Sequence, residues 1–472
     1  MASSETLTPY ERRRLENIRR NEEMMSSLML RRKASDFSSS LKRPSSPSSS
    51  SSPDSKKPKN PKKAQTPVVV VTRRSLRTRG LPPDQSQHSE HPQPPSPPPN
   101  SPPAPPWKSG PFPISDAFVG EVGSSCRRLI DVILGSSGEP RPDFGEVGFD
   151  PRSEMVLGPE NVAKVLPQRI LTVKFLPYVD RTVIVSGDKL GNLGFWDVDG
   201  RREGGDGHDE MFVFSPHRGP VSGITIHPAS STKIISSCYD GFVCLMDTEK
   251  ETFNMIYCSD NSIFSICQCP HDNNTLYLGE GLGELKSLDM RAGKVTSTWD
   301  LHEQRINTVD FNPENTNLLA TSSTDGMACI WDLRSIKRNR VECLKTVQHC
   351  RAIHSAYFSP SGSCLATTSY DNRVGILTGT NFDDQRMIKH NNKTGKWLSS
   401  FRAIWGWDDS YLYLGNMKRA VDIISINKLA ITSLESEHMT SIPCRFAAHP
   451  YKQGSLASAT AGGKVYLWRK LC

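Results

Sequence analysis

One short stretch of the sequence combines residue types that suit nucleic-acid binding. Residues 390–405 read HNNKTGKWLSSFRAIW and contain Lys393, Lys396, Trp397 and Arg402. Ammonium and guanidinium groups pair with backbone phosphates, and an indole ring stacks on a base or enters a groove as a wedge. A tryptophan in such a loop otherwise packs on its own structural element, and the residues alone leave both interpretations open.

A second pair of motifs has the chemistry of a protein-binding site. WDLR spans residues 331–334, and the weaker LDMR spans residues 288–291. Each motif places an arginine two residues after an aspartate. A guanidinium fork forms paired hydrogen bonds with a carboxylate of a partner. The ordinary alternative is that Trp-Asp simply ends a repeated strand.

Both stretches lie in a repeat that begins near residue 165. Its three clearest copies begin at His217, His302 and His349. Each copy has a leading histidine, an alternating apolar strand, a turn with proline, a second strand, and Asp-Gly or Asp-Asn before a third strand. The spacing from the histidine to the turn aspartate is 23, 23 and 22 residues. Such regularity is typical of WD-repeat β-propellers, whose blades recur at about 40–45 residues.

Weaker copies bring the expected number of blades to seven. They end at Asp197, Asp289, Ile423 and Trp468. The sequence therefore predicts an all-β fold, a seven-bladed WD-repeat β-propeller over residues 151–472. We expect the segment near 150–164 to supply the outer strand of the last blade, because a closed ring leaves no exposed sheet edge.

The repeat also predicts where basic residues gather. In a propeller of this type the leading histidine and the turn aspartate lie on one face, so cations just before the first strand, or in the turn after the second, share that face. The candidates are Arg169, Lys189, Arg218, Arg305, Arg351, Lys418 and Arg419. Such a ring suits phosphates. The alternative is that Lys and Arg are simply common in exposed turns.

The stretch at 390–405 falls between the fifth and sixth blades and opens on the same face. We expect a β-hairpin there that projects over the pore, with Lys393, Lys396 and Arg402 facing phosphates. The arginines of WDLR and LDMR are expected on the opposite face, on adjacent blades. The two sets of candidate residues therefore belong to separate surfaces.

The first 110 residues differ in composition from the remainder. They hold 19 of the 35 prolines, and 20 Lys and Arg against 9 Asp and Glu, a balance of +11. The remainder has 38 against 41, a balance of −3. Residues 1–110 are predicted to be a disordered basic tail, because they bury too little apolar surface to offset ordering entropy. A linker and lead-in would follow at 111–150.

Three features of the tail have candidate roles. Thr8, Pro9 and Glu11 predict the start of a helix at about 8–32, which either stays solvated or docks on a partner. A polyproline spacer covers 92–106. A basic cluster suits nuclear import, although such clusters also arise by chance in solvated tails: Lys56, Lys57, Lys59, Lys62 and Lys63.

Several classes of function find no support in the sequence. We find no nucleophile elbow, metal-binding His pair or phosphate-binding Lys loop, so an enzyme and a cofactor are not expected. The 12 cysteines form no CxxC pair and are expected to be free, reduced thiols rather than metal ligands. With no signal peptide and no apolar run of about 18 residues, a soluble intracellular protein is expected.

The paired LDMR and WDLR motifs resemble the sequence by which WD-repeat substrate receptors bind the adaptor of cullin-4 ubiquitin ligases. The resemblance implies that the adaptor contacts are Asp289, Arg291, Asp332 and Arg334. The first copy lacks the tryptophan of the motif.

The blades and residues 390–405 resemble the small subunit of the ultraviolet-damaged-DNA-binding protein. That family carries a Phe-Gln-His triplet where this chain has Gly395, Lys396 and Trp397, so the leading Phe wedge is absent. Arg169 and Lys189 fall where the family has DNA-contacting cations.

The propeller and parts of the tail resemble the WD repeat-containing protein 76, or changed-mutation-rate, family. The residues that carry this resemblance are YERRRLENIRRNEEMM, RRSLR and HNNKTGKWL. It implies a nuclear, nonenzymatic protein of the DNA-damage response that binds intact or damaged duplex DNA. The alternatives are a substrate receptor of a cullin-4 ligase, or a scaffold for histones or other chromatin proteins that reads a peptide in its pore.

Overall fold

The computed structural model describes residues 19, 110–120, 126–136, 148–200, 210–336 and 342–471. The chain divides into two units, Met1–Pro98 and Pro99–Cys472. Within the first unit, Arg19 is helical. The rest of the helix expected at about 8–32, the lysine cluster at 56–63 and the polyproline spacer at 92–106 lie outside the described residues.

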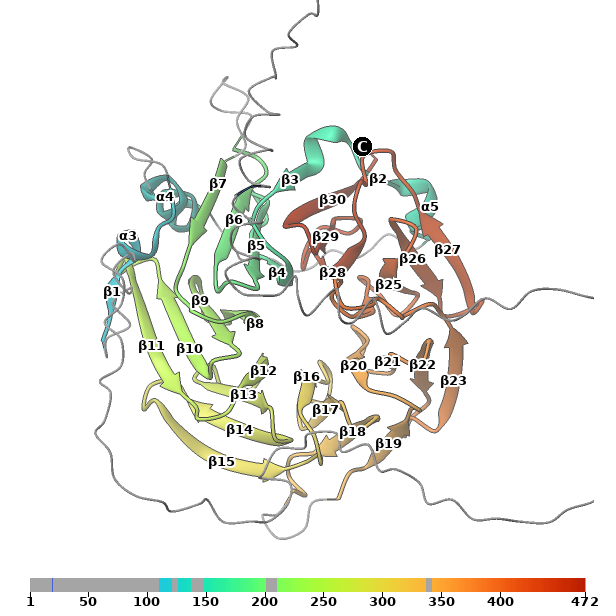
Figure 1. Cartoon of the computed structure of the whole chain (residues 1–472). Helices are drawn as coiled ribbons and strands as arrows, with labels where there is room; N and C mark the ends of the chain where they lie inside the picture. The colour runs from blue at the N-terminus through green and yellow to red at the C-terminus, as the bar shows by residue number, and fades with distance from the viewer. Residues whose placement is uncertain are drawn as a thin grey trace, which may run out of the picture. The chain divides into compact units, whose positions relative to one another are not determined.

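The described strands of the second unit form seven antiparallel sheets arranged as a ring (Figure 1), which confirms the predicted seven-bladed propeller. Each blade runs from an innermost strand beside the central channel to an outermost strand. Blade 1 comprises β4 (Ile170–Phe175), β5 (Val183–Asp188), β6 (Leu193–Asp197) and β7 (Glu210–Phe214), and blade 2 comprises β8 (Val221–His227), β9 (Ser230–Cys238), β10 (Phe242–Asp247) and β11 (Thr252–Cys258). Blade 3 comprises β12 (Ile263–Gln268), β13 (Thr275–Glu280), β14 (Glu284–Asp289) and β15 (Lys294–Asp300), and blade 4 comprises β16 (Ile306–Phe311), β17 (Leu318–Ser323), β18 (Met327–Asp332) and β19 (Lys345–Gln348). Blades 5 to 7 comprise β20 (Ile353–Phe358), β21 (Leu365–Ser369), β22 (Arg373–Thr378), β23 (Asp384–Lys389); β24 (Ile404–Trp405), β25 (Tyr411–Asn416), β26 (Ala420–Ser425), β27 (Ala430–Leu434); and β28 (Pro443–Ala448), β29 (Leu456–Thr460), β30 (Lys464–Lys470).

The last blade is completed by chain that precedes the first blade. β2 (Met155–Val156) and β3 (Val162–Lys164) both pair antiparallel with β30, in the registers Met155 to Lys470 and Val162 to Tyr466. The short α5 (Pro151–Glu154) and the 3₁₀ turn η2 (Pro159–Asn161) flank these strands. The prediction that residues near 150–164 close the ring is confirmed.

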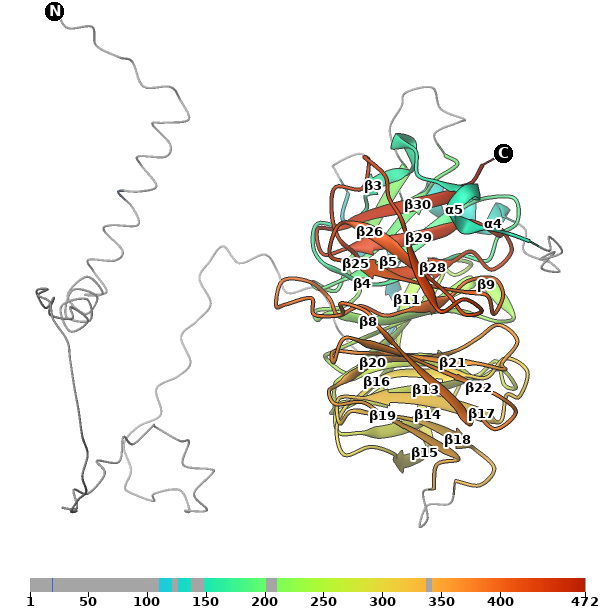
Figure 2. The ribbon, with the colours of Figure 1, turned by 90° about the vertical axis from the view of Figure 1, so that its right-hand side faces the viewer.

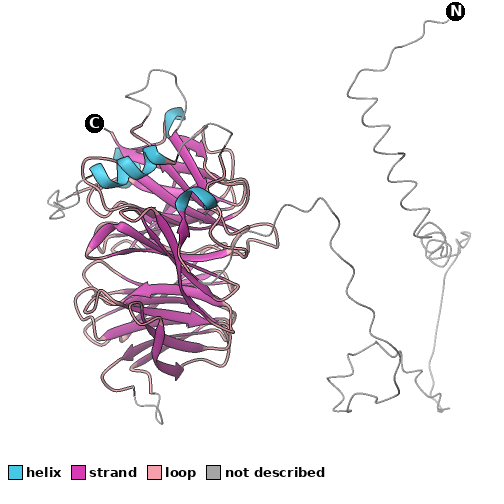
Figure 3. Ribbon diagram, turned by 90° about the vertical axis from the view of Figure 1, so that its left-hand side faces the viewer, coloured by secondary structure: helices cyan, strands magenta, loops and turns pink. Residues whose placement is uncertain are grey.

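The described parts of the lead-in, residues 110–120 and 126–136, pack against the ring. β1 (Phe112–Pro113) pairs with β11 as a fifth strand of blade 2. After α3 (Ile114–Ala117), α4 (Arg127–Gly135) buries one apolar face among the residues of blades 1 and 2. Figure 3 shows these helices at the outer edge of the described strands.

The core is divided among the contacts between blades. Seven clusters of buried apolar residues each join two neighbouring blades, because alternate side chains of every strand face the adjacent sheet. Figure 2, turned by 90°, shows strands running from one face of the ring to the other. The turns and loops that join them therefore gather on two opposite faces.

The repeat spacing brings each leading histidine to a partner within its blade. The imidazole of His302 pairs through Nδ1 with Asp325 Oδ2 at 2.9 Å and through Nε2 with Thr321 Oγ1 at 2.7 Å. The indole N–H of Trp331 donates to the same hydroxyl at 2.8 Å. His349 repeats the contact with Asp371 at 3.0 Å. This network of hydrogen bonds satisfies buried polar groups where the loop that carries the leading histidine packs on the second strand and on the turn that follows it.

Replacing Trp331 with phenylalanine is expected to cost more than the same change at Trp468. Both indoles are buried, but the Nε1 of Trp468 has no hydrogen-bond partner among the described residues. Trp331→Phe should lower the free energy of unfolding by about 1 kcal/mol more than Trp468→Phe, the worth of one hydrogen bond. Denaturant titration of both variants measures the difference, and equal losses would contradict the network.

Candidate nucleic-acid interface

Residues 390–403 form an irregular loop between β23 and β24, so the predicted β-hairpin is wrong. Backbone pairing resumes only at β24, and the loop turns at Gly395 with φ of 69°. The side-chain amide of Asn392 donates to the carbonyls of Ser369 at 2.9 Å and Arg373 at 3.0 Å. Side chains hold the loop base in place of a strand ladder, as asparagine does where it competes with regular structure.

The first residues of the loop are anchors rather than ligands. His390 pairs through Nδ1 with Asn392 Oδ1 at 2.7 Å and through Nε2 with Asp422 Oδ2 at 3.0 Å. The imidazole and the amide are buried. The base of the loop is therefore fixed to blades 5 and 6, and its position sets where the tip stands.

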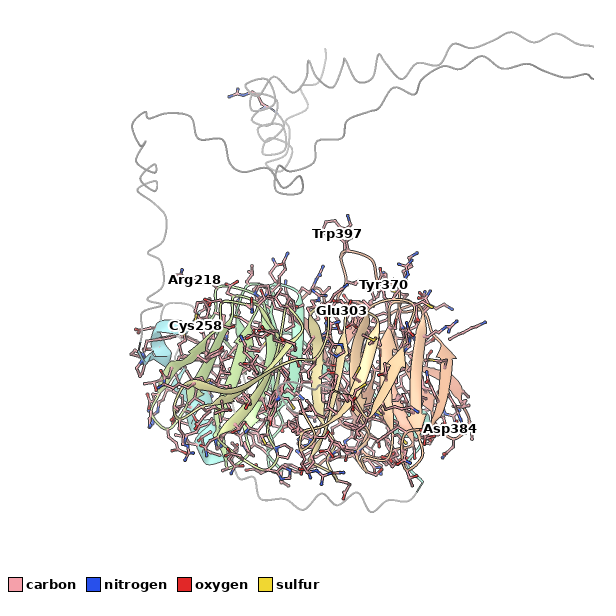
Figure 4. All side chains as sticks on the ribbon, turned by 90° about the horizontal axis from the view of Figure 1, so that it is seen from below. Arg218, Cys258, Glu303, Tyr370, Asp384 and Trp397 are labelled. Atoms are coloured by element: carbon pink, nitrogen blue, oxygen red, sulfur yellow. The ribbon has the colours of Figure 1, made fainter. Side chains whose placement is uncertain are left out.

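The tip of the loop carries the exposed candidates. Trp397 is 86% exposed and stands out from the face of the ring (Figure 4), and Lys393 and Lys396 are exposed beside it. The structure excludes the alternative that this tryptophan packs on its own blade. We call residues 393–397 the loop tip.

Arg169, which lies just before blade 1, holds the loop tip. Its Nη2 donates to the carbonyl oxygens of Lys396 at 3.1 Å and Trp397 at 2.5 Å. Arg169 precedes β4 in blade 1, so the contact joins blade 1 to the segment before blade 6, past the intervening blade 7. The guanidinium predicted to contact DNA orients the residues that carry the exposed indole and ammonium.

Five other predicted cations are exposed on the same face as the loop tip. They precede innermost strands or lie in turns after second strands, as the repeat requires, and Figure 4 shows Arg218 on the face that bears Trp397 while Asp384 lies on the other. We call these residues the cation rim: Lys189, Arg218, Arg351, Lys418 and Arg419. Arg419 has φ of 65°, a conformation imposed by its tight turn.

Two predicted cations lie lower, at the channel. The guanidinium of Arg305 lies over the ring of Phe264, 4.7 Å from its centroid, and its Nε donates to Asn307 Oδ1 at 3.1 Å. Arg402 was expected on the hairpin. Its Nη2 instead donates to the carbonyl of Asn307 at 3.2 Å, because residues 401–403 have already turned into the channel wall ahead of β24.

The opposite face carries the arginines of the two motifs. Arg334 forms a fork with the carboxylate of Asp332 at 2.7 and 3.0 Å and is 66% exposed. This pairing holds the pKa of Asp332 below its ordinary value. Arg291 lies 3.8 Å from Asp289 and is 72% exposed. The pairs follow β18 and β14, so they occupy adjacent blades as predicted.

The channel holds charged residues that the sequence reasoning missed. Burial raises the pKa of Asp310 to about 7 and lowers that of Arg445 to about 10. Both belong to innermost strands, β16 and β28, and both line a cavity of about 280 Å³ with Lys174 and Arg402. The only signal in the sequence was a charge within the apolar strands INTVDF and PCRFAA.

Two structural searches over the described residues were negative. Those residues contain no cluster of three or more His, Cys, Asp or Glu arranged to hold a metal ion. In the same ranges, no helix has the length and apolar character needed to cross a membrane.

The sequence matches the WD domain, G-beta repeat, over residues 209–247, 293–332 and 341–376. Each matched stretch begins in or just before the outer strand of one blade and ends in the third strand of the next. The family match therefore agrees with the blades of the structure.

Named relatives extend the similarity. WD repeat-containing protein 76 of Xenopus laevis is 29% identical over 66% of this chain, and that of Mus musculus is 27% identical over 67%. These matches cover 55% and 51% of the relatives, so this chain spans about half their length. The DNA damage-binding protein cmr1 of Aspergillus clavatus is 27% identical over 98% of this chain and 99% of its own. The predicted resemblance to proteins of both names is confirmed.

Removing the guanidinium of Arg169 is expected to loosen the loop tip. Arg169→Ala should speed amide hydrogen exchange of residues 393–398 by about fivefold, because roughly 1 kcal/mol of hydrogen bonding to two carbonyls is removed. Lys189→Ala, on the adjacent turn of the same blade, should leave exchange unchanged. Mass spectrometry of the exchanged protein measures both, and equal protection in both variants would contradict the tether.

Asp310 is expected to make stability depend on pH. Its pKa is raised by burial to about 7, against about 3.9 in an unfolded chain, although Lys174 and the Phe358 N–H oppose the shift. Between those values the folded chain keeps a proton that the unfolded chain has lost, so stability falls as pH rises.

An asparagine at this position does not titrate, so Asp310→Asn does not lose stability in this way. The free energy of unfolding of the variant, minus that of the native chain, should rise by roughly 1 kcal/mol per pH unit from pH 5 to 7. Denaturant titrations at several pH values measure the difference. Parallel pH profiles for the two proteins would show that Asp310 keeps an ordinary pKa.

Proposed function

We propose that this chain binds duplex DNA through the loop tip and the cation rim, as a nuclear protein of the DNA-damage response. The observation that carries the proposal is the loop tip itself. The exposed Trp397 shares the loop tip with the exposed Lys393 and Lys396, and Arg169 holds the backbone there. The same face of the ring also bears five exposed cations, those of the cation rim. The relatives named DNA damage-binding protein cmr1 support the same ligand.

The exposed indole has a physical cost that a bound base would remove. Burying a tryptophan side chain recovers up to several kcal/mol at about 25 cal/mol per Å² of apolar surface. Base stacking on an aromatic ring contributes about 1–3 kcal/mol. Because Arg169 and Asn392 already fix the backbone around Trp397, little further ordering is needed when DNA binds.

The charges favour a duplex over a neutral ligand. Residues 111–472 have a balance of −3, yet the loop tip and the cation rim place seven exposed Lys and Arg on one face: Lys189, Arg218, Arg351, Lys393, Lys396, Lys418 and Arg419. A local positive surface on a near-neutral body binds phosphates and releases counterions. The tail, with its balance of +11, adds sequence-independent affinity, and its cluster at 56–63 suits nuclear import.

The opposite face supports a second function that is compatible with the first. Arg291 and Arg334 project from adjacent blades and are mostly exposed. We propose them, with Asp289 and Asp332, as contacts for the adaptor of a cullin-4 ubiquitin ligase. An adaptor carboxylate would displace Asp332 from the Arg334 fork and would pair with the guanidinium of Arg291, which lies 3.8 Å from Asp289. The chain would then bring a ligase to DNA-bound proteins, histones among them.

Replacing the loop-tip residues is expected to separate phosphate binding from base stacking. In the full chain, Lys393→Ala with Lys396→Ala should reduce the slope of log affinity against log salt by roughly 2, about one for each phosphate that is no longer neutralised. Trp397→Ala should weaken duplex binding by about fivefold to hundredfold and leave the slope unchanged. Fluorescence anisotropy with a labelled duplex at several salt concentrations measures both.

The matched control lies on the other face. Arg291→Ala with Arg334→Ala also removes two cations, yet should leave duplex affinity and salt slope as in the native chain while reducing capture of the ligase adaptor. If the two double variants change the salt slope equally, duplex affinity depends only on the net charge of the protein and not on where the charges lie. The loop tip would then lose its assigned role.

A further inference from the structure

The central channel contains an arginine cluster that no carboxylate of the described residues neutralises. Arg445, on β28, is 8% exposed, and its guanidinium donates to the carbonyl oxygens of Leu171 at 2.7 Å, Cys444 at 3.0 Å and Ser400. Arg402 bonds only the carbonyl of Asn307. Among the described residues, neither guanidinium forms an ion pair. A buried charge is normally paired, because burial without a counter-charge is costly.

Two buried nitrogens in this region lack partners. The Nε of Arg402 and the Nε2 of His354, on β20, are enclosed and have no hydrogen-bond partner among the described residues. Burial and then the positive charges of Arg402, Arg445 and Arg305 lower the pKa of His354 to about 3. Three guanidinium groups thus lie close enough to affect one imidazole. An enclosed polar atom without a partner is costly, so this part of the channel wall carries positive charge that the surrounding groups compensate only in part.

A cavity leads to these arginines. It has a volume of about 280 Å³ and is lined by Arg402 and Arg445 together with Lys174, Asp310 and Tyr357. The Asp310 carboxyl accepts a hydrogen bond from the Phe358 N–H at 2.8 Å and is not ion-paired with either arginine. The cavity wall therefore presents three cationic groups and one buried acid.

We propose that this channel cavity binds one oxyanion, a phosphate or carboxylate, carried by an acidic side chain of a partner protein. Guanidinium groups form charge-assisted, paired hydrogen bonds with both kinds of oxyanion. The cavity holds a few side chains but is far too small for a duplex, whose phosphates stay on the rim. The positive lining also disfavours a basic peptide such as a histone tail, the occupant expected from the sequence for a scaffold.

The residues that line the cavity place it toward one face of the ring. Its lining includes Phe358, Trp405 and Ala448, the last residues of β20, β24 and β28. These strand ends lie farthest from the loop tip, on the side of Arg291 and Arg334. A peptide entering there would leave the cation rim free, so the acidic side chain and a duplex would bind at the same time.

The test uses the full chain and defined probes. A degenerate peptide library with one central phosphoserine, its unphosphorylated form, inorganic phosphate and a 20-base-pair duplex are each titrated by calorimetry. The phosphoserine peptides should bind at least tenfold more tightly than the unphosphorylated ones and than inorganic phosphate. Saturating duplex should not displace them.

The informative variant is Arg402→Gln, because Arg402 makes a single hydrogen bond and its loss is less disruptive to folding than that of Arg445. The change should weaken phosphopeptide binding by about tenfold to hundredfold. Lys418→Ala with Arg419→Ala, a matched loss of charge on the cation rim, should not. An unchanged melting temperature of each variant shows that the fold is intact.

Other results would overturn the proposal. Binding of inorganic phosphate as tight as that of the peptides would assign the cavity to a free anion. Displacement of phosphate by duplex, lost in Arg402→Gln, would assign it to DNA. Equal phosphopeptide affinity in Arg402→Gln and the native chain would show that the phosphopeptide does not bind in the channel cavity. Duplex binding by the Lys393→Ala and Lys396→Ala variant is a separate measurement, so failure here leaves the DNA proposal untouched.

Discussion

The pairing of β2 and β3 with β30 is the contact on which the rest of the molecule depends. Six blades take their four principal strands from consecutive sequence, but blade 7 needs strands from before blade 1. Without them β30 would be left as the exposed outer edge of blade 7, which is open to pairing with other chains. Closure also places blade 7 between blades 6 and 1, and so sets the position from which Arg169 reaches the loop tip.

A closed ring turns a repetitive sequence into three distinct surfaces. Because every innermost strand runs in the same direction along the channel, its start and end lie on opposite faces. Residues before the first strand and after the second form the cation rim, while residues after the third form the pairs at Arg291 and Arg334. Side chains that point inward from the first strands converge on the channel. The three sets have no residue in common, so each can be changed by substitution without altering the residues of the others.

Much of this arrangement could be predicted from the sequence because the repeat carries it. Histidine-to-aspartate spacing gave the blades, and their order gave the faces, so the positions of Lys189, Arg218 and Arg334 follow from local pattern alone. The loop at 390–403 could not be predicted in the same way. Its course depends on hydrogen bonds from Asn392 to Ser369 and Arg373, which lie 23 and 19 residues earlier, at the ends of two strands of blade 5.

The roles of Arg169, Arg402 and the channel residues were hidden for a related reason. A sequence shows that an arginine stands near a loop but not whether its guanidinium meets solvent, a carbonyl or a second arginine. Arg402 faces Asn307, and Asp310 lies in the same cavity as Arg445, only because seven separate strands converge. Their altered pKa values are products of that burial and have no counterpart in local sequence.

The most direct test of the DNA-binding proposal is the duplex affinity of residues 99–472, the second unit, which lacks all but the last twelve residues of the basic tail. Fluorescence anisotropy at low and moderate salt would be recorded for this unit and for its Lys393→Ala, Lys396→Ala, Trp397→Ala variant. Salt-sensitive binding that the triple variant loses is the predicted result, and it would assign DNA binding to the loop tip. Absence of binding by the unit, with binding by the full chain, would show that the tail alone holds DNA and would contradict the proposal.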